Sequence, residues 1–262
     1  MTGAVELLER GPFRPLGRIV RSSNSAVLVE VGSGAEARLA IHKPIAFERP
    51  LWDYPDGHLA HRERAAYLIS EAGGFGVVPP TVLREGPWGE GSLQLWIGAP
   101  DEEPELVVAV TAPDEVPTGW IDVLTGVDED DEEVVLSHAD DAELRSTAVL
   151  DAVLNNSDRK GLHLVRVPDG IRGFDHGVSL GVDPKLRTVL WGWAGQDLPA
   201  GDLARLARIR DDLTSGSLAA ELVPLLTGEE RHALRDRVDA LVATGRHPAP
   251  APGWPAIPWP AM

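Results

Sequence analysis

The 262-residue sequence contains no cysteine, only three lysines among its 24 basic residues, and 5% aromatic residues. Without cysteine the chain can form no disulfide, no thiolate metal site and no cysteine nucleophile, which excludes extracellular folds that depend on disulfides. No stretch approaches the roughly 18 consecutive apolar residues of a membrane-spanning helix. The opening MTGAVELLERG carries acids where a signal peptide has a basic and then an apolar region. We therefore expect a cytoplasmic protein.

Positive charge is also scarce. With 24 basic and 41 acidic residues the formal net charge is -17, so no overall basic field attracts a polyphosphate backbone or an anionic leaflet. Nucleic-acid binding and stable membrane attachment are not expected. Hydrophobic residues at 43% and charged residues at 25% are typical of a soluble protein with a sizeable core. The acids of residues 128–133 repel one another and predict a solvated loop.

The first hundred residues predict an antiparallel sheet and one helix. In the third strand Leu39, Ile41 and Lys43 alternate onto one face, so the lysine shares its side with core residues. The apolar spacing of residues 58–72 predicts a helix that turns Glu63 toward its apolar stripe. The predicted strands are 17–20, 26–31, 38–43, 81–84 and 92–97.

A Gly/Pro/Glu-rich segment, residues 98–104, predicts a boundary between two lobes. We expect a first lobe over residues 1–99, a second lobe over 100–246, and a Pro/Trp-rich tail over 247–262 that is extended along the surface or binds a protein partner. The second lobe is predicted to be mostly helical, and the last of its helices opens with a Thr-x-x-Glu capping box. The predicted helices are 140–155, 201–213, 217–226 and 229–243.

One hairpin is expected among those helices, because residues 162–167 and 171–175 flank a Pro-Asp-Gly turn. If Val167 pairs with Ile171, the register places His163 opposite Asp175. Two metal-capable side chains would then meet at the open end of the hairpin.

Four short patterns follow one another along the chain: a strand ending in Lys43, an inward Glu63, the run Asn156-Ser-Asp158-Arg-Lys160, and Asp175-His-Gly177. Taken singly, each has an ordinary structural explanation as an ion pair, a helix cap or a turn. Taken together, they supply what phosphoryl transfer from ATP needs. These parts are a lysine for the triphosphate, an acid that fixes the lysine, an aspartate at the acceptor hydroxyl, and metal ligands.

In this order the motifs resemble the protein-kinase-like superfamily, and within it the phosphatidylinositol 3-/4-kinase-like group with the HipA-type toxin kinases. The resemblance is strongest to an uncharacterised actinobacterial branch and covers nearly the whole chain. It implies an α+β, two-lobed protein-kinase-like fold with an antiparallel β-sheet N-lobe and a mostly helical C-lobe. Besides the catalytic-loop and metal motifs, the segments that carry it are Ser22-Ser-Asn24, Lys43-Pro, Arg49-Pro-Leu-Trp-Asp53, Val78-Pro-Pro-Thr81, Gly161-Leu-His163 and Leu186-Arg-Thr-Val-Leu-Trp191.

The resemblance implies ATP with Mg²⁺ or Mn²⁺ as cofactors. It makes Asp158 the residue that takes or orients the acceptor proton, and it brings Lys160 to the γ-phosphate. Asp175 would bind the metal together with His163, which stands where the family has asparagine and suits manganese or zinc better than magnesium. The residues assigned to the nucleotide are Ser22, Ser23 and Asn24 over the phosphates, Lys43 on the α- and β-phosphates, Glu63 orienting it, and Gln94, Trp96 and Ile97 in the adenine hinge.

Three functions remain open at this point: a kinase acting on a protein, lipid or small-molecule hydroxyl, a nucleotide-binding pseudokinase or scaffold, and an AMP transferase. His163 in place of asparagine favours the pseudokinase, whereas retention of Lys43, Glu63, Asp158 and Asp175 favours catalysis. A lipid kinase would be expected to show a basic membrane-facing helix. Because the arginines of residues 229–243 are interspersed with acids, a protein or small-molecule acceptor is favoured.

Overall fold

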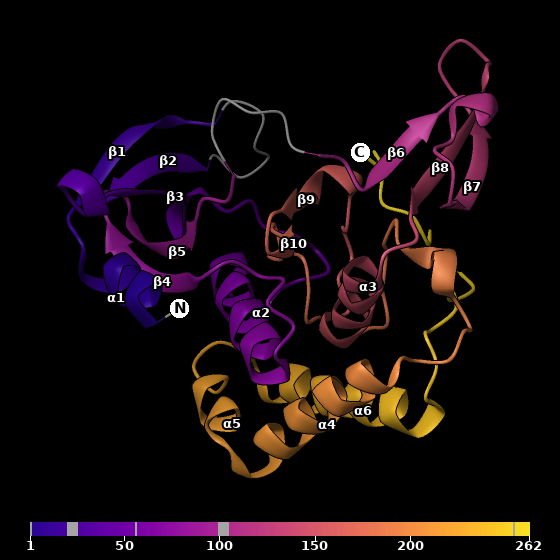
Figure 1. Cartoon of the computed structure of the whole chain (residues 1–262). Coiled ribbons are helices and arrows are strands. Elements are labelled where there is room, and N and C mark those ends of the chain that lie inside the picture. The colour runs from indigo at the N-terminus through magenta and orange to yellow at the C-terminus, as the bar shows by residue number, and fades with distance from the viewer. Residues whose placement is uncertain (1, 20–25, 56, 99–104, 254) are drawn as a thin grey trace.

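The computed structural model describes residues 2–19, 26–55, 57–98, 105–253 and 255–262. Its first lobe is built on a five-stranded antiparallel sheet in the order β1-β2-β3-β5-β4 (Figure 1). The predicted meander is confirmed, although its first strand lies earlier than residues 17–20. The strands are β1 (Phe13–Arg18), β2 (Val27–Val31), β3 (Arg38–Pro44), β4 (Thr81–Gly86) and β5 (Gly89–Leu95).

Two helices pack against this sheet. α1 (Thr2–Arg10), which the sequence did not predict, lies against β4 and β5 and buries Leu8 among the strand valines. α2 (Leu59–Gly73) is the predicted helix and ends at Gly74, whose left-handed φ of 68° closes its last turn. Because α2 also contacts α4, it connects the sheet with the helices of the second lobe.

In Figure 1 three helices of the second lobe, α4, α5 and α6, lie below α2, and α3 is drawn to its right. The capping box expected at the start of the last helix is present, with Thr227 and Glu230 bonded reciprocally. The third predicted helix is shorter than residues 217–226, since Pro224 lacks the N–H that a helix would need there. The helices are α3 (Ala142–Leu154), α4 (Ala200–Ser215), α5 (Ser217–Glu221) and α6 (Gly228–Thr244).

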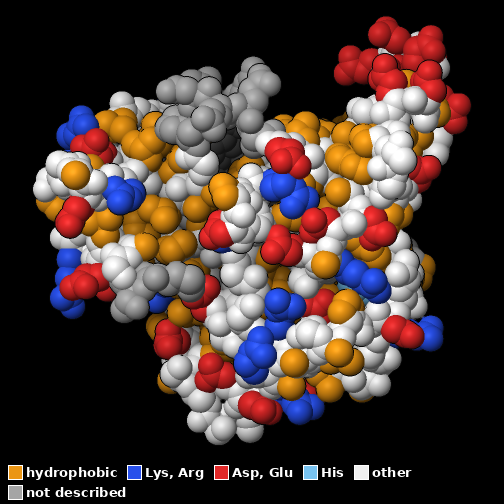
Figure 2. All heavy atoms as spheres, in the orientation of Figure 1, with side chains coloured by type: hydrophobic (Ala, Val, Ile, Leu, Met, Phe, Trp, Pro, Cys, Tyr) orange, Lys and Arg blue, Asp and Glu red, His pale blue; other side chains and the backbone are white. Residues whose placement is uncertain are grey.

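The second lobe also contains a three-stranded sheet that the sequence did not predict. Its strands are β6 (Val108–Thr111), β7 (Trp120–Val127) and β8 (Glu133–Ala139), in the order β6-β8-β7. The acidic run is the turn between β7 and β8, with Glu133 already in the strand. Figure 2 shows acidic side chains gathered on a projecting tip over this hairpin. The predicted solvated loop is therefore confirmed, and the structure shows that it connects two strands at the end of a sheet.

The predicted hairpin is present as β9 (Leu164–Val167) and β10 (Gly170–Gly173), but its register was predicted wrongly. Gly170, not Ile171, pairs with Val167, because the turn has two residues and Gly170 takes a φ of 131°. One residue of slip exchanges the strand faces. His163 consequently lies opposite Phe174, whose N–H donates to the His163 carbonyl at 3.0 Å.

The tail runs along the second lobe and ends beside β6 (Figure 1). Trp191 Nε1 donates to the Ala256 carbonyl at 2.9 Å, and the Gly161 N–H donates to the Ala261 carbonyl at 2.8 Å. The tail is thus bonded to the segments on either side of the hairpin. In the part of the chain that the structure describes, no helix combines the length and the apolar character needed to cross a membrane.

Candidate functional site

Three elements bring a lysine and two carboxylates together between the lobes. Lys43 near the end of β3 bonds through Nζ to Glu63 Oε1 on α2 and, at 2.7 Å, to Asp175 Oδ1 after β10. Burial opposes the charge of Lys43, but Asp175 and Glu63 offset it and raise the pKa of the ammonium above its usual range. The Lys43 side chain remains 20% exposed, so the cation is fixed yet accessible.

Asp175 adopts a left-handed conformation, with φ at 62°, which is uncommon for a residue other than glycine. The charge of Lys43 outweighs burial and holds the pKa of Asp175 well below its usual range. Its Oδ2 lies 3.5 Å from Nε2 of His163. The structure therefore brings these two predicted metal ligands together, although the register argument for their meeting was wrong.

The imidazole of His163 is neutral over the ordinary pH range, because burial lowers its pKa to about 4. Its Nδ1 is buried and has no hydrogen-bond partner among the residues described. Neutral imidazole is the form that binds a metal ion. Among the described residues, no group of three or more His, Asp or Glu side chains is arranged to hold a metal. The protein would thus supply two ligands at this point, and phosphate and water oxygens would supply the others.

The predicted catalytic loop begins where α3 ends. Asn155 closes α3 in a left-handed conformation with φ at 51°. Asn156 then fixes the turn, because its Nδ2 donates to Asp151 Oδ1 at 3.1 Å and its Oδ1 accepts from the Asp158 N–H at 3.0 Å. These bonds hold the Asp158 backbone against the end of the helix.

Asp158 is half-buried and lies 3.4 Å from Lys160. Burial raises the pKa of Asp158, the charge of Lys160 opposes that shift, and the nearby Asp175 adds to it. A carboxylate whose pKa is raised is a better proton acceptor than one at its usual value. This pair therefore combines a base with a cation at one edge of the site.

A buried ion pair that the sequence reasoning missed connects the loop to Asp175. Arg159 and Asp151 are both fully buried and bonded through the guanidinium at 2.9 Å. Arg159 also donates to the Phe174 carbonyl at 3.1 Å and to Nε2 of His176 at 2.6 Å, on either side of Asp175. Asp151, an acidic residue within the apolar pattern of the helix, was the sequence feature that could have indicated this ion pair.

The predicted hinge residues lie at the end of β5. Gln94 is buried and its Nε2 donates to Thr81 Oγ1 at 2.8 Å, so this side chain joins β5 to β4. The Trp96 N–H donates to the Leu39 carbonyl at 2.9 Å, and Ile97 is half-buried. The predicted phosphate-covering residues Ser22, Ser23 and Asn24 lie outside the described residues.

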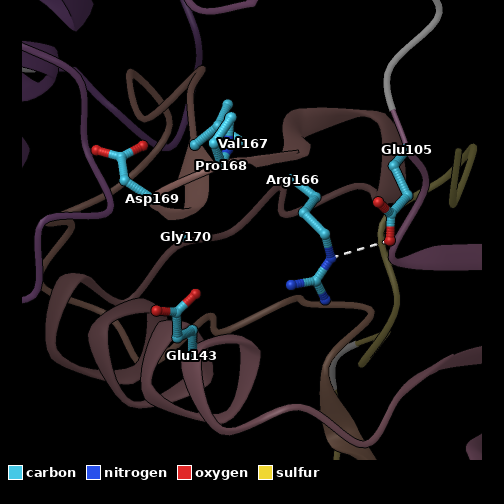
Figure 3. Close-up of a pocket in the computed structure, with 7 residues that line it drawn as sticks. All are labelled: Glu105, Glu143, Arg166, Val167, Pro168, Asp169 and Gly170. Atoms are coloured by element: carbon cyan, nitrogen blue, oxygen red, sulfur yellow. Dashed lines mark ion pairs between the residues drawn. The ribbon is translucent and has the colours of Figure 1, made fainter.

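A hollow of about 670 Å³ lies elsewhere, at the turn of the β9–β10 hairpin (Figure 3). Glu105, Glu143 and Asp169 contribute carboxylates to its lining. Arg166, which also lines it, is already paired with Glu105 at 3.0 Å and with Asp141 at 3.1 Å. With three acids and a cation that is already engaged, this hollow does not suit a nucleotide.

Comparison with known proteins places the chain in a family. It is 43% identical to protein Rv2133c of Mycobacterium tuberculosis over 265 aligned residues, which cover 98% of this chain and 94% of that protein. The chain belongs to the Rv2133c family. No protein-family model matches the sequence.

The fold of this Rv2133c relative is also found among solved structures. The crystal structure of the Golgi casein kinase with Mn and ADP bound matches with a TM-score of 0.57 at 13% identity, covering 93% of this chain and 74% of that one. A second crystal structure of the Golgi casein kinase matches with a TM-score of 0.50. The chain has an α+β, two-lobed kinase-like fold, as the sequence predicted.

Proposed function

We propose that this member of the Rv2133c family is an ATP-dependent phosphotransferase that transfers the γ-phosphate of ATP to an acceptor hydroxyl. The observation that carries the proposal is the position of Lys43, whose ammonium is held between Glu63 and Asp175 and is still partly exposed. A lysine fixed by an acid, next to a second acid that can bind metal, is the arrangement that phosphoryl transfer requires.

In this function Lys43 binds the α- and β-phosphates and Glu63 keeps it oriented. The adenine lies against the end of β5, at Gln94, Trp96 and Ile97, where backbone groups recognise it. Because the Gln94 side chain is bonded to Thr81, it acts by supporting the hinge. By resemblance, the role of covering the phosphates falls to residues 22–24, which lie outside the described residues.

Asp175 and His163 fit one divalent ion, Mg²⁺ or Mn²⁺, since a carboxylate oxygen and a neutral imidazole nitrogen face each other. When bound, the ion neutralises charge on the phosphate oxygens. The mixed nitrogen and oxygen pair favours manganese over magnesium relative to a site made of oxygens alone.

The transfer step follows from the residues that remain. The acceptor oxygen forms a bond to the γ-phosphorus, the bond from that phosphorus to the bridging oxygen breaks, and ADP leaves with the electron pair. Asp158 takes the hydroxyl proton, for which its raised pKa suits it. Lys160 stabilises negative charge on the phosphate oxygens during the transfer.

The order of the motifs supports a narrower assignment to the phosphatidylinositol 3-/4-kinase-like type, with a protein, a lipid or a small molecule as acceptor. The net charge of -17 supports a protein or small-molecule acceptor over a lipid in an anionic membrane. A cytoplasmic location, and a protein partner bound through the acidic surface or the Pro/Trp-rich tail, belong to the same proposal.

Nucleotide binding is tested with Lys43→Ala. ATP with Mn²⁺ or Mg²⁺ should raise the melting temperature of the wild-type protein, because a ligand at 100 times its Kd adds about 2.7 kcal/mol to the free energy of unfolding. Lys43→Ala should lose most of that shift. Arg10→Ala, which removes an exposed cation at the end of α1, should retain it. The absence of a shift with ATP or ADP in the wild-type protein would contradict the proposed function.

Catalysis is tested separately with Asp158→Asn. Loss of a general base lowers turnover by about 10²- to 10⁴-fold, whereas the ATP-induced thermal shift should persist because Asp158 does not hold the nucleotide. Labelled ATP, followed in both its α- and γ-phosphates, measures the transfer. Label transferred from the α-phosphate would instead identify the AMP transferase.

The pseudokinase remains a second candidate because His163 stands in the asparagine position. It predicts that the wild-type protein binds ATP and divalent metal but transfers no phosphate to any acceptor, its own hydroxyls included. Turnover in the wild-type protein, lost in Asp158→Asn, would exclude it.

A further inference from the structure

Arg187 is an arginine beside the catalytic loop that the proposed reaction does not use. Its N–H donates to the Asn156 carbonyl at 2.9 Å, and its carbonyl accepts from the Arg159 N–H at 3.0 Å. The backbone of Arg187 is thus paired with the segment that carries Asp158. These bonds hold any side chain at this position beside the catalytic loop.

The side chain of Arg187 has no protein partner within the ranges that the structure describes. Its Nε is buried without a hydrogen-bond partner, and no carboxylate forms an ion pair with its guanidinium. Arg237 also has one buried nitrogen without a partner, but its other nitrogens donate to the carbonyls of Val153 and Gly181. A buried donor left unsatisfied destabilises a protein, so an unused guanidinium points to a ligand.

The charge of the Arg187 guanidinium affects the part of the site where the acceptor hydroxyl would bind, around Asp158. Burial raises the pKa of Asp158 and of Tyr54, and the charge of Arg187 opposes the shift in both. Tyr54 is itself bonded to Ser157 through its hydroxyl, at 2.9 Å. The charge of Lys43 is the largest influence on the pKa of Asp175. Together with the backbone bonds to Asn156 and Arg159, this electrostatic effect indicates that the guanidinium acts on the part of the site that contains Asp158 and Tyr54.

A second basic residue lies nearby in the sequence and the fold. Lys185 is buried, with Nζ 3.5 Å from Asp53 and 3.6 Å from Asp183, and it lies under the Trp52 ring at 4.7 Å from its centre. The Trp52 ring is 79% exposed. The backbone N–H of Lys185 donates to Asn155 Oδ1 at 2.9 Å, so the segment that carries Lys185 and Arg187 is bonded to the start of the catalytic loop.

We propose that Arg187 binds an anionic group, a phosphate or a carboxylate, on a small acceptor molecule whose hydroxyl faces Asp158. This inference rests on the proposed phosphotransferase function and specifies its substrate class. A planar guanidinium with free donors matches either anion through two parallel hydrogen bonds. The acceptor is small because a strongly acidic protein repels an acidic macromolecule, whereas one arginine suffices to bind a single anionic group.

The test is a calorimetric titration of inorganic phosphate into the protein saturated with Mn²⁺ and a non-hydrolysable ATP analogue, which fills the γ-phosphate position. Wild-type protein should bind phosphate, and Arg187→Gln should weaken the Kd by about tenfold or more. Arg187→Lys keeps the positive charge but not the planar guanidinium, and its phosphate affinity should fall less than that of Arg187→Gln. Arg10→Gln removes an exposed cation on α1 and should leave the Kd unchanged. Acetate in place of phosphate distinguishes a carboxylate site from a phosphate site.

Three results would overturn the inference. The first is equal anion affinity in Arg187→Gln and wild type when both have the same melting temperature. The second is that the wild type binds neither phosphate nor acetate. The third is phosphate binding with ADP that disappears with the ATP analogue, since Arg187 would then bind the transferred phosphate. Failure of the proposed function would give a different result, because neither ADP nor the ATP analogue would bind. Phosphate binding by Arg187 could then still be measured in the absence of nucleotide.

Discussion

His163 and Asp175 set the chemistry of the site at the scale of single residues. The carboxylate is kept ionised by Lys43, and the imidazole is kept neutral by burial, which lowers its pKa to about 4. Each residue is therefore in its metal-binding protonation state at neutral pH. The pair needs no proton release before an ion can bind.

Replacing His163 by asparagine should change the metal preference while leaving transfer intact. The ratio of manganese-supported to magnesium-supported activity should fall by about tenfold, the scale on which changes around a metal alter its affinity. His58→Asn, at an exposed histidine before α2, serves as the control. If His163 only packs at the start of the hairpin, His163→Asn would lower stability and leave the ratio unchanged.

At the scale of elements, α6 shows how local signals fix a helix end. Thr227 accepts from the Glu230 N–H, and Glu230 accepts from the Thr227 N–H at 2.8 Å, which satisfies two donors that the helix itself leaves free. Glu230 also pairs with the buried Arg62 of α2. The helix start is therefore bonded to the helix that connects the lobes.

Thr227→Ala should lower the free energy of unfolding by about 1 kcal/mol, the usual cost of losing an N-cap. Urea unfolding measures the change. Thr214→Ala on α4 is the control, because that hydroxyl bonds to a carbonyl within the same helix on an exposed face. A loss no greater than in the control would contradict the role of the capping box.

Elements with strong local signals were predictable from the sequence. The apolar spacing of α2 and α3 and the capping box of α6 place these helices within a few residues of their observed bounds. The inward face that carries Glu63 is confirmed, and Lys43 meets Glu63. The core assignment in β3 was wrong, because the strand buries Ala40 and His42 and leaves the face of Leu39, Ile41 and Lys43 half-buried. In each case the deciding information lies within one element.

Most of what the sequence did not reveal depends on partners that are distant along the chain. The β6–β8 sheet joins residues 108 and 138, and no local pattern selects that pairing. The hairpin register depended on the choice between a two-residue and a three-residue turn. The connection from Arg159 to both neighbours of Asp175, and the unpaired Arg187, appear only when segments far apart in sequence are placed side by side.

Considered as a whole molecule, the protein buries histidines in their neutral form. Burial lowers the pKa of His42 and of His247 to about 4. The unfolded chain takes up these protons near pH 6.5, before the native state can. The contribution of these neutral histidines to the free energy of unfolding is therefore fully present above pH 6.5 and is lost as the pH falls toward 4.

The free energy of unfolding should drop between pH 7 and pH 5, with one such histidine contributing about 2 kcal/mol. His42→Phe keeps a ring packed against Phe13 and should flatten this dependence, measured by urea unfolding at the two pH values. His232→Ala, at a histidine whose side chain is 76% exposed, should leave it unchanged. An identical pH dependence in wild type and His42→Phe would contradict the assignment.

The placement of the three lysines makes the side-chain amines of this protein a local probe. Lys43 and Lys160 have side chains 20% and 21% exposed in the site, and Lys185 is 5% exposed beside Asp53. Reagents that acylate amines, and enzymes that acetylate lysine, thus find side-chain targets only around the proposed reaction centre. Acetylation there would remove the charge that holds the phosphates. Mass spectrometry of a sample acylated with and without nucleotide would therefore measure nucleotide binding at this region from the three peptides that contain lysine.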